Sequence, residues 1–127
     1  MYLKEVIMND LNEFMATEVM GWHKERIAPH TSNPLFWHDE QGNSLMYCYA
    51  WHPDTDLNQA RDCLTKLCKD AYCHAELFYN YIDNTWLVQI WNEVPVTDTD
   101  ADIESEIRAD KLPLAICEAI KQAVKNG

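Results

Sequence analysis

The chain has 127 residues, 47% of them hydrophobic, which is enough to bury the core of one domain spanning residues 1–127. Its 21 acidic residues outnumber 10 basic ones and give a formal charge of −11, which disfavours direct binding to nucleic acids and to anionic membranes. The sequence lacks an apolar run of about 20 residues and a signal-peptide centre, and its five cysteines are an odd number, so we expect reduced thiols in the cytoplasm.

Three segments have the spacing of amphipathic helices. The first runs from about Asn9 to Met20, and Gly21 is placed to end it. Residues 22–34 show no period and suit a surface connection. A second helix is expected after Thr55 or Asp56, either of which can act as its N-cap. The third has apolar residues at every fourth position, with Pro113 tolerated in its first turn; these residues are Leu112, Ile116, Ile120 and Val124.

Two pairs of β-prone runs lie between these helices. Residues 35–37 and 45–50 flank the turn formers of 39–43, and residues 75–82 and 85–91 flank Asp83-Asn84. Both faces of the second hairpin are apolar, which indicates cover on both sides. The predicted fold is therefore α+β in the order α-β-β-α-β-β-α, a four-stranded antiparallel sheet with helices packed on both faces.

Three sequence blocks resemble the phage ABA-sandwich domain, a family of phage and prophage proteins. They are Leu11 to Trp22, which closes with Val-Met-Gly-Trp, Pro53 to Ala60, and Pro113 to Ile120. The resemblance implies an α-β-α sandwich of about this length, in agreement with the argument from strand faces. It implies no activity and supplies no site residues, and a fold does not fix a function.

The nearest approach to a metal site is the group Cys63, Cys68, Cys73 and His74, to which Cys48 or His52 could be added. Zinc knuckles place paired cysteines two to four residues apart, whereas here the gaps are five. Cys63 and Cys68 also lie on the apolar face of the second helix, where a thiol acts as a small hydrophobe. We therefore expect no metal and no cofactor.

Acidic residues alternate with smaller ones over 97–106, and the segment has no glycine for a calcium loop. The chain also has five tryptophans and six tyrosines, and aromatic side chains are typical interface anchors. The candidate interaction surface consists of Trp22, Trp37, Trp51, Asp98, Asp100, Asp102, Glu104 and Glu106.

These features favour a non-enzymatic module that binds a protein partner or itself. One alternative is an acidic domain that imitates DNA and occupies a nucleic-acid-binding host protein. Another, from a different class, is a small metal-dependent or Cys/His enzyme built from Cys73, His74, His52 and nearby acids.

Overall fold

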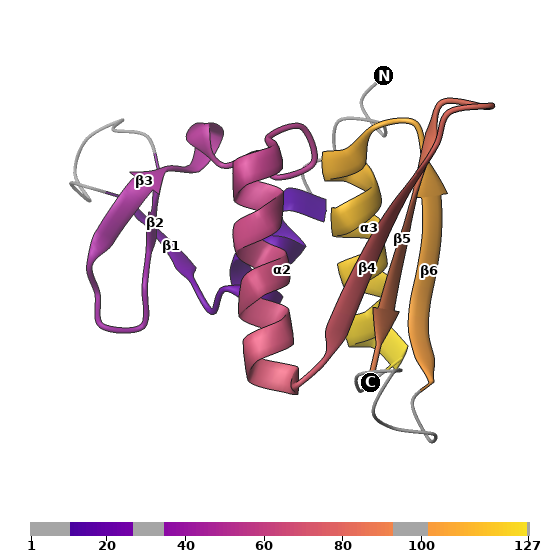
Figure 1. Cartoon of the computed structure of the whole chain (residues 1–127). Coiled ribbons are helices and arrows are strands. Elements are labelled where there is room, and N and C mark those ends of the chain that lie inside the picture. Colours follow the sequence, from indigo (N-terminus) through magenta and orange to yellow (C-terminus); the bar gives the residue numbers. More distant parts are fainter. Residues whose placement is uncertain (1–10, 27–34, 93–101, 127) are drawn as a thin grey trace. The chain divides into compact units, whose positions relative to one another are not determined.

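The computed structural model describes residues 11–26, 35–92 and 102–126 (Figure 1). The chain divides into two compact units, Met1–His52 and Pro53–Gly127, and each is described by itself. None of the helices in the described residues is both long and apolar enough to cross a bilayer. The prediction of a single domain over residues 1–127 stays a prediction.

In the first unit, residues 11–14 are α-helical and continue directly into the π-helical turn η1, Met15–Val19. Its apolar side chains Met15, Ala16 and Val19 are buried, as the helical spacing predicted. Gly21 adopts a φ of +76°, a left-handed conformation that favours glycine, and the helix ends there as predicted.

The sheet of the first unit has the antiparallel order β1-β2-β3, formed by His23–Arg26, Leu35–His38 and Ser44–Tyr47. Asp39 closes the β2-β3 turn because its carboxylate accepts hydrogen bonds from the backbone N–H groups of Gln41 and Asn43. The chain then forms a 3₁₀ turn, η2, at Cys48–Ala50. The first predicted hairpin is therefore confirmed, but its second strand ends at Tyr47 and not at Ala50.

The second unit begins its regular structure with α2, Leu57–Ala71. Asp56 is the N-cap and accepts a hydrogen bond from the backbone N–H of Gln59, as the sequence predicted. At the other end Tyr72 takes the left-handed conformation, φ 54° and ψ 45°. The third predicted helix is also confirmed as α3, Leu112–Asn126.

The sheet of this unit has the antiparallel order β4-β5-β6, formed by His74–Asn80, Thr85–Trp91 and Ile103–Ala109. The second predicted hairpin is confirmed, although its strands end at Asn80 and restart at Thr85, so the turn also includes Tyr81 and Ile82. Asn84 has the positive φ that was expected of this turn.

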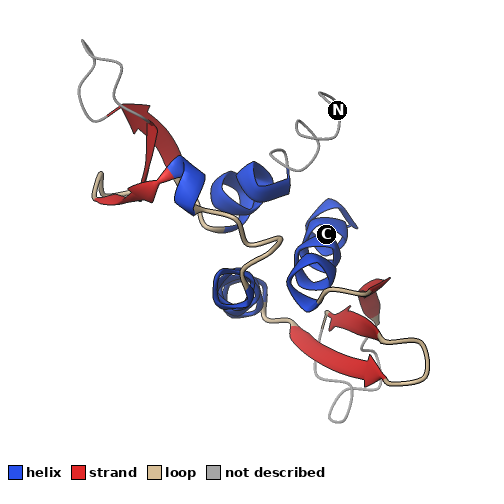
Figure 2. Ribbon diagram, turned by 90° about the horizontal axis from the view of Figure 1, so that it is seen from above, coloured by secondary structure: helices blue, strands red, loops and turns tan. Residues whose placement is uncertain are grey.

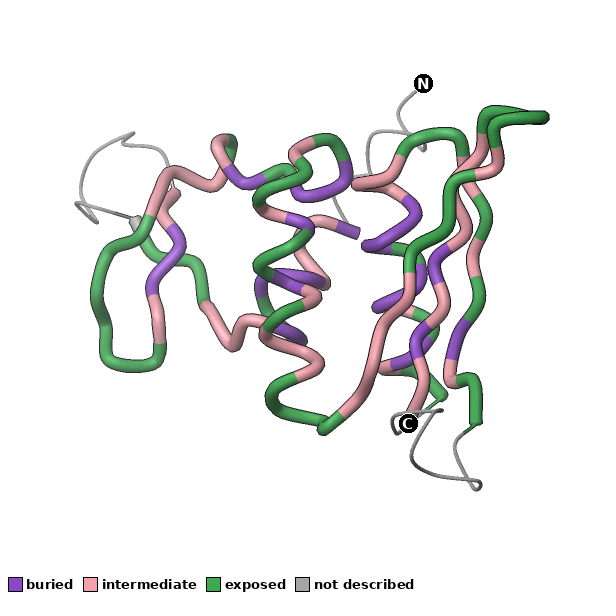
Figure 3. Tube along the Cα trace, viewed as in Figure 1, coloured by how far each residue is buried: buried purple, intermediate pink, exposed green. Residues whose placement is uncertain are grey.

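Both helices of the second unit lie on the same side of its sheet (Figure 2). Val88 and Ile90 of β5 point to that side and are buried, together with Ser105 of β6. The inner face of α3 is buried along its length (Figure 3). Its alanines Ala115 and Ala119 are fully buried and leave room for close packing.

The α+β class is confirmed, whereas the four-stranded sheet with helices on both faces is wrong. Each hairpin gains a third strand, so the described residues form two three-stranded sheets. In the second unit the described helices cover one face only. On the other face, Phe78 of β4, Leu87 of β5 and Arg108 of β6 are cross-strand neighbours. Phe78 is 47% exposed, so no described helix takes the place that the prediction gave to one.

Candidate protein-interaction site

The first unit holds a pocket of about 330 Å³ whose walls combine three aromatic residues with polar and charged ones. Its residues come from the helical segment, β1, β2, η2 and the position after η2. They are Asn12, Glu13, Lys24, Trp37, Cys48, Tyr49 and Trp51. A cavity of this size suits a single side chain or a short peptide segment.

Two tryptophans form the buried walls of this pocket. Trp37 is 2% exposed and Trp51 is 4% exposed. The Trp51 indole N–H donates a 2.8 Å hydrogen bond to the backbone carbonyl of Asn12. Trp22 packs against Trp51 in an edge-to-face pair with ring centroids 4.6 Å apart. These contacts fix the position of the Trp51 ring.

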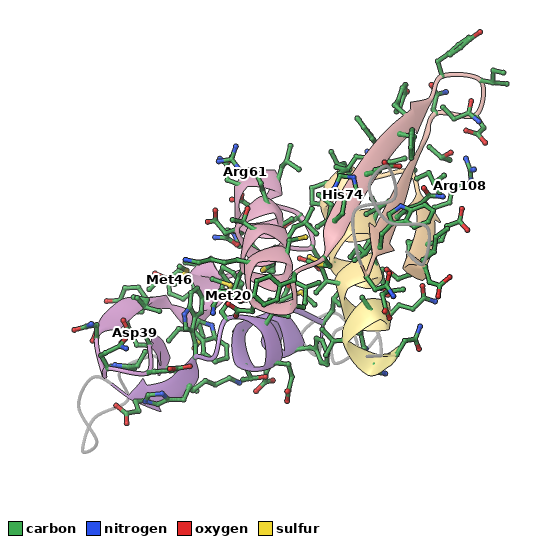
Figure 4. The ribbon with its side chains drawn as sticks, turned by 60° about the horizontal axis from the view of Figure 1, so that its bottom comes forward. Met20, Asp39, Met46, Arg61, His74 and Arg108 are labelled. Carbon is green, nitrogen blue, oxygen red and sulfur yellow. The ribbon has the colours of Figure 1, made fainter. Side chains whose placement is uncertain are left out.

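An ion pair lies at the edge of the pocket. Lys24 Nζ is 2.8 Å from Glu13 Oε1 and 5.5 Å from the centroid of the Trp37 ring. Lys24 and Trp37 are direct cross-strand partners on β1 and β2, which places the ammonium over the indole. Met46 of β3, labelled in Figure 4, has Trp37 as its cross-strand partner on β2.

Tyr49 is the exposed member of an aromatic series. Phe36 and Tyr47 are cross-strand partners with centroids 4.3 Å apart, and Tyr47 stacks on Tyr49 at 5.1 Å with an interplanar angle of 16°. The Tyr49 ring is held by this stack, yet the residue is 74% exposed. A large, ordered and exposed aromatic ring at the edge of a pocket is the usual form of an interface anchor.

The Trp37 indole N–H is buried and has no hydrogen-bond partner among the described residues. Buried indole N–H groups normally have a partner, since leaving one unsatisfied costs about 1–3 kcal/mol. The nitrogen is also inaccessible to solvent, so this cost belongs to the folded structure of the unit.

The pocket thiol is not activated as a nucleophile. Burial raises the pKa of Cys48. The positive charge of Lys24 lowers this pKa and the negative charge of Glu13 raises it, so the two charges oppose each other. The thiol therefore stays protonated at neutral pH and lines the pocket as a small apolar group. The chemistry available here is recognition by aromatic, apolar and hydrogen-bonding groups.

The structure brings together the three tryptophans of the predicted interaction surface. Trp37 and Trp51 line one pocket, and Trp22 contacts Trp51. Because Trp37 and Trp51 are buried, the exposed anchor is Tyr49, which the sequence analysis did not single out. The alternation of side chains along two paired strands could have predicted that Lys24 lies beside Trp37. This was missed because β1 was not predicted.

The predicted acidic residues do not line this pocket. Asp98 and Asp100 lie outside the described residues. Asp102, Glu104 and Glu106 lie at and along β6 in the second unit. Glu106 accepts a hydrogen bond from the side-chain amide of Gln89, and the DNA-mimic alternative stays a prediction.

Of the predicted metal or enzyme site, only Cys68 and Cys73 are known to be in contact, with their Sγ atoms 3.2 Å apart. Burial, with a smaller contribution from the neighbouring Asp62, raises the pKa of Cys63 to about 12. His74 Nε2 lies 3.3 Å from Glu76 Oε1 on β4. Across residues 11–26, 35–92 and 102–126, no three His, Cys, Asp or Glu side chains are grouped to hold a metal ion.

The fold is similar to that of a phage protein. A crystal structure of a phage protein from Bacillus cereus ATCC 14579 superposes with a TM-score of 0.57 at 15% sequence identity, over 92% of this chain and 86% of the other. At that identity the likeness establishes the fold alone. No curated protein matches the sequence.

The family model of the phage ABA sandwich domain matches residues 13–120. The chain belongs to this family, and the resemblance found in the sequence blocks is confirmed. The description of the family names a phage origin and an architecture but no enzymatic activity.

Proposed function

We propose that this phage domain is a non-enzymatic protein-interaction module of the bacterial cytoplasm, and that the aromatic pocket of its first unit binds a short segment of a partner protein. The observation that carries the proposal is the combination at one pocket of an exposed, stacked Tyr49 with the buried rings of Trp37 and Trp51.

The partner segment is basic. The described residues of the first unit contain only two cations, Lys24 and Arg26. They contain five carboxylates, Glu13, Glu18, Glu25, Asp39 and Glu40. The whole chain has a net charge of −11, so long-range electrostatics attract a basic partner and repel an acidic one.

The segment also places one apolar or aromatic side chain in the pocket. Trp37, Trp51 and Cys48 supply apolar wall atoms, and Tyr49 supplies a ring that covers the entering group. Lys24 already occupies the position over the Trp37 ring, so the entering group is not itself the cation.

The test uses three fluorescent peptides of equal length and fluorescence anisotropy. One peptide is lysine- and arginine-rich with a central tryptophan, the second replaces the basic residues by glutamate, and the third replaces the tryptophan by serine. We expect the first to bind, with an affinity that falls as salt is raised, and the other two to bind at least tenfold more weakly.

Tyr49→Ala is expected to weaken binding of the first peptide by roughly tenfold or more, because it removes the exposed anchor. Tyr81→Ala is the matched control, since Tyr81 is 80% exposed and belongs to the other unit. Equal binding of the acidic peptide, or equal affinities for the two variants with unchanged circular dichroism, would contradict the proposal.

A further inference from the structure

Two cysteines meet where α2 ends. The Cys73 thiol donates to the Cys68 sulfur, and the two Sγ atoms are 3.2 Å apart. Both residues are partly exposed and free, unlike Cys63 and Cys117, which are fully buried. Cys68 belongs to the last turns of α2, and Cys73 directly precedes β4.

The way the helix ends explains why the thiols meet. Tyr72 is left-handed and its backbone N–H donates to the carbonyl of Cys68, to which the Cys73 N–H also donates at 3.2 Å. In this type of helix end, the residue after the left-handed one folds back over the residue five positions earlier, and the two side chains touch. Here both of those side chains are thiols, so the backbone itself fixes their proximity.

We propose that Cys68 and Cys73 form a modification site, a dithiol that closes to an intrachain disulfide by exchange with a low-molecular-weight disulfide such as oxidised glutathione.

The reaction has two exchange steps. The Cys68 thiolate attacks one sulfur of oxidised glutathione, forms a mixed disulfide and releases one glutathione thiolate, which takes up the proton that Cys68 lost. Cys73 then loses its proton and attacks the Cys68 sulfur, which expels the second glutathione. The two protein thiols are oxidised by two electrons, and one oxidised glutathione is reduced to two thiols.

The contact between the thiols also assigns their roles. The hydrogen bond from Cys73 lowers the pKa of Cys68, and burial opposes this effect. The same hydrogen bond raises the pKa of Cys73, with burial and the nearby Glu104 adding to it. Cys68 is therefore the attacking thiol and Cys73 the resolving one.

The second step is fast because the resolving thiol is already in contact with its target. Reacting groups held at contact distance have effective concentrations far above those of any thiol in solution. The mixed disulfide on Cys68 is therefore short-lived. The product disulfide links the end of α2 to the start of β4, beside a cavity of about 210 Å³ that Cys73 lines together with Glu104 and Asn92.

The test treats the reduced full-length protein anaerobically with oxidised glutathione, stops the reaction with acid, and counts free thiols after unfolding. We expect the number of free thiols to fall from five to three, because two thiols form the disulfide. The oxidised protein should carry no bound glutathione. Peptide mapping should join the Cys68 and Cys73 peptides. Cys73→Ser should instead accumulate one glutathione adduct on Cys68.

Cys48→Ser is the matched control, because Cys48 is a partly exposed cysteine of the other unit, and it should still form the disulfide. The proposal is overturned if the wild-type protein keeps five thiols, if it keeps glutathione on Cys68 as Cys73→Ser does, or if the disulfide joins other cysteines.

Discussion

The indole N–H of Trp51 donates a hydrogen bond of 2.8 Å to the backbone carbonyl of Asn12, 39 residues earlier in the chain. This bond connects Trp51, near the end of the first unit, to the helical segment at residues 11–19. Both residues line the candidate pocket, so the geometry of the binding site and the stability of the unit depend on the same contact.

Trp51→Phe should therefore destabilise the protein while keeping an aromatic ring at the position. The loss of the hydrogen bond is expected to lower the free energy of unfolding by about 1 kcal/mol, measured by urea denaturation. Trp22→Phe changes the ring that packs against Trp51. It removes no side-chain hydrogen bond seen among the described residues, so it should lower the free energy of unfolding by less. Equal losses would contradict the assigned role of the Asn12 carbonyl.

Tyr72→Gly should make the protein more stable. Tyr72 has a φ of 54°, which costs a residue with a Cβ about 1–2 kcal/mol. Its side chain is 86% exposed, so little packing is lost. After the greater flexibility of unfolded glycine is subtracted, we expect a gain of about 0.5–1 kcal/mol. Tyr81→Gly is the control, because Tyr81 is similarly exposed without a positive φ, and this change should not stabilise.

The carboxyl group of Asp39 should titrate below its ordinary value of 3.8. The backbone N–H of Asn43 lowers the pKa most, against a smaller rise from burial, and the Asn43 amide with the backbone of Gln41 and Gly42 lowers it further. Because the folded pKa is below the unfolded one, the turn is stabilised above the unfolded pKa, and this stability is lost as the pH falls through the folded pKa.

Carbon-detected NMR of the Asp39 carboxyl group measures this pKa directly. Asn43→Ala removes the side-chain donor and keeps the backbone donor, so the pKa should move part of the way back toward 3.8. A wild-type pKa at or above 3.8 would show that the turn hydrogen bonds are not formed in solution.

The buried cysteines should resist alkylation until the protein unfolds. With a pKa of about 12, roughly one Cys63 thiol in ten thousand is a thiolate at pH 8. Burial also raises the pKa of Cys117, with smaller contributions from Cys63, Asp54 and Glu118. Labelling with iodoacetamide followed by peptide mapping should find Cys68 modified in the native state, and Cys63 and Cys117 modified only as urea unfolds the chain.

The helices and hairpins were predictable because local residues decide them. Asp56 caps α2 with its own side chain, Gly21 ends the first helix by its own backbone freedom, and Leu112 to Val124 repeat every fourth position along α3. The three blocks that carry the family resemblance include these same helix starts and ends, and the family was identified correctly from them.

The strands β1 and β6 were not part of the predicted sheets, although the alternation in the acidic segment was compatible with a strand. The four residues of β1 are His-Lys-Glu-Arg, and β6 alternates acidic residues with others, so neither has an apolar run. Each is a strand because its backbone bonds to a hairpin edge, and backbone groups are the same for every residue. The local pattern showed two hairpins but not the third strand that each one takes.

The sequence by itself determined the α+β class, the three helices, the two hairpins and the family, because side-chain periodicity and capping act over a few residues. Only the tertiary structure decided that there are two sheets, that Trp37, Trp51 and Tyr49 share one pocket, and that two thiols touch at the end of α2. These outcomes depend on which backbone edges pair and how each turn directs the chain, and residue types alone do not specify either.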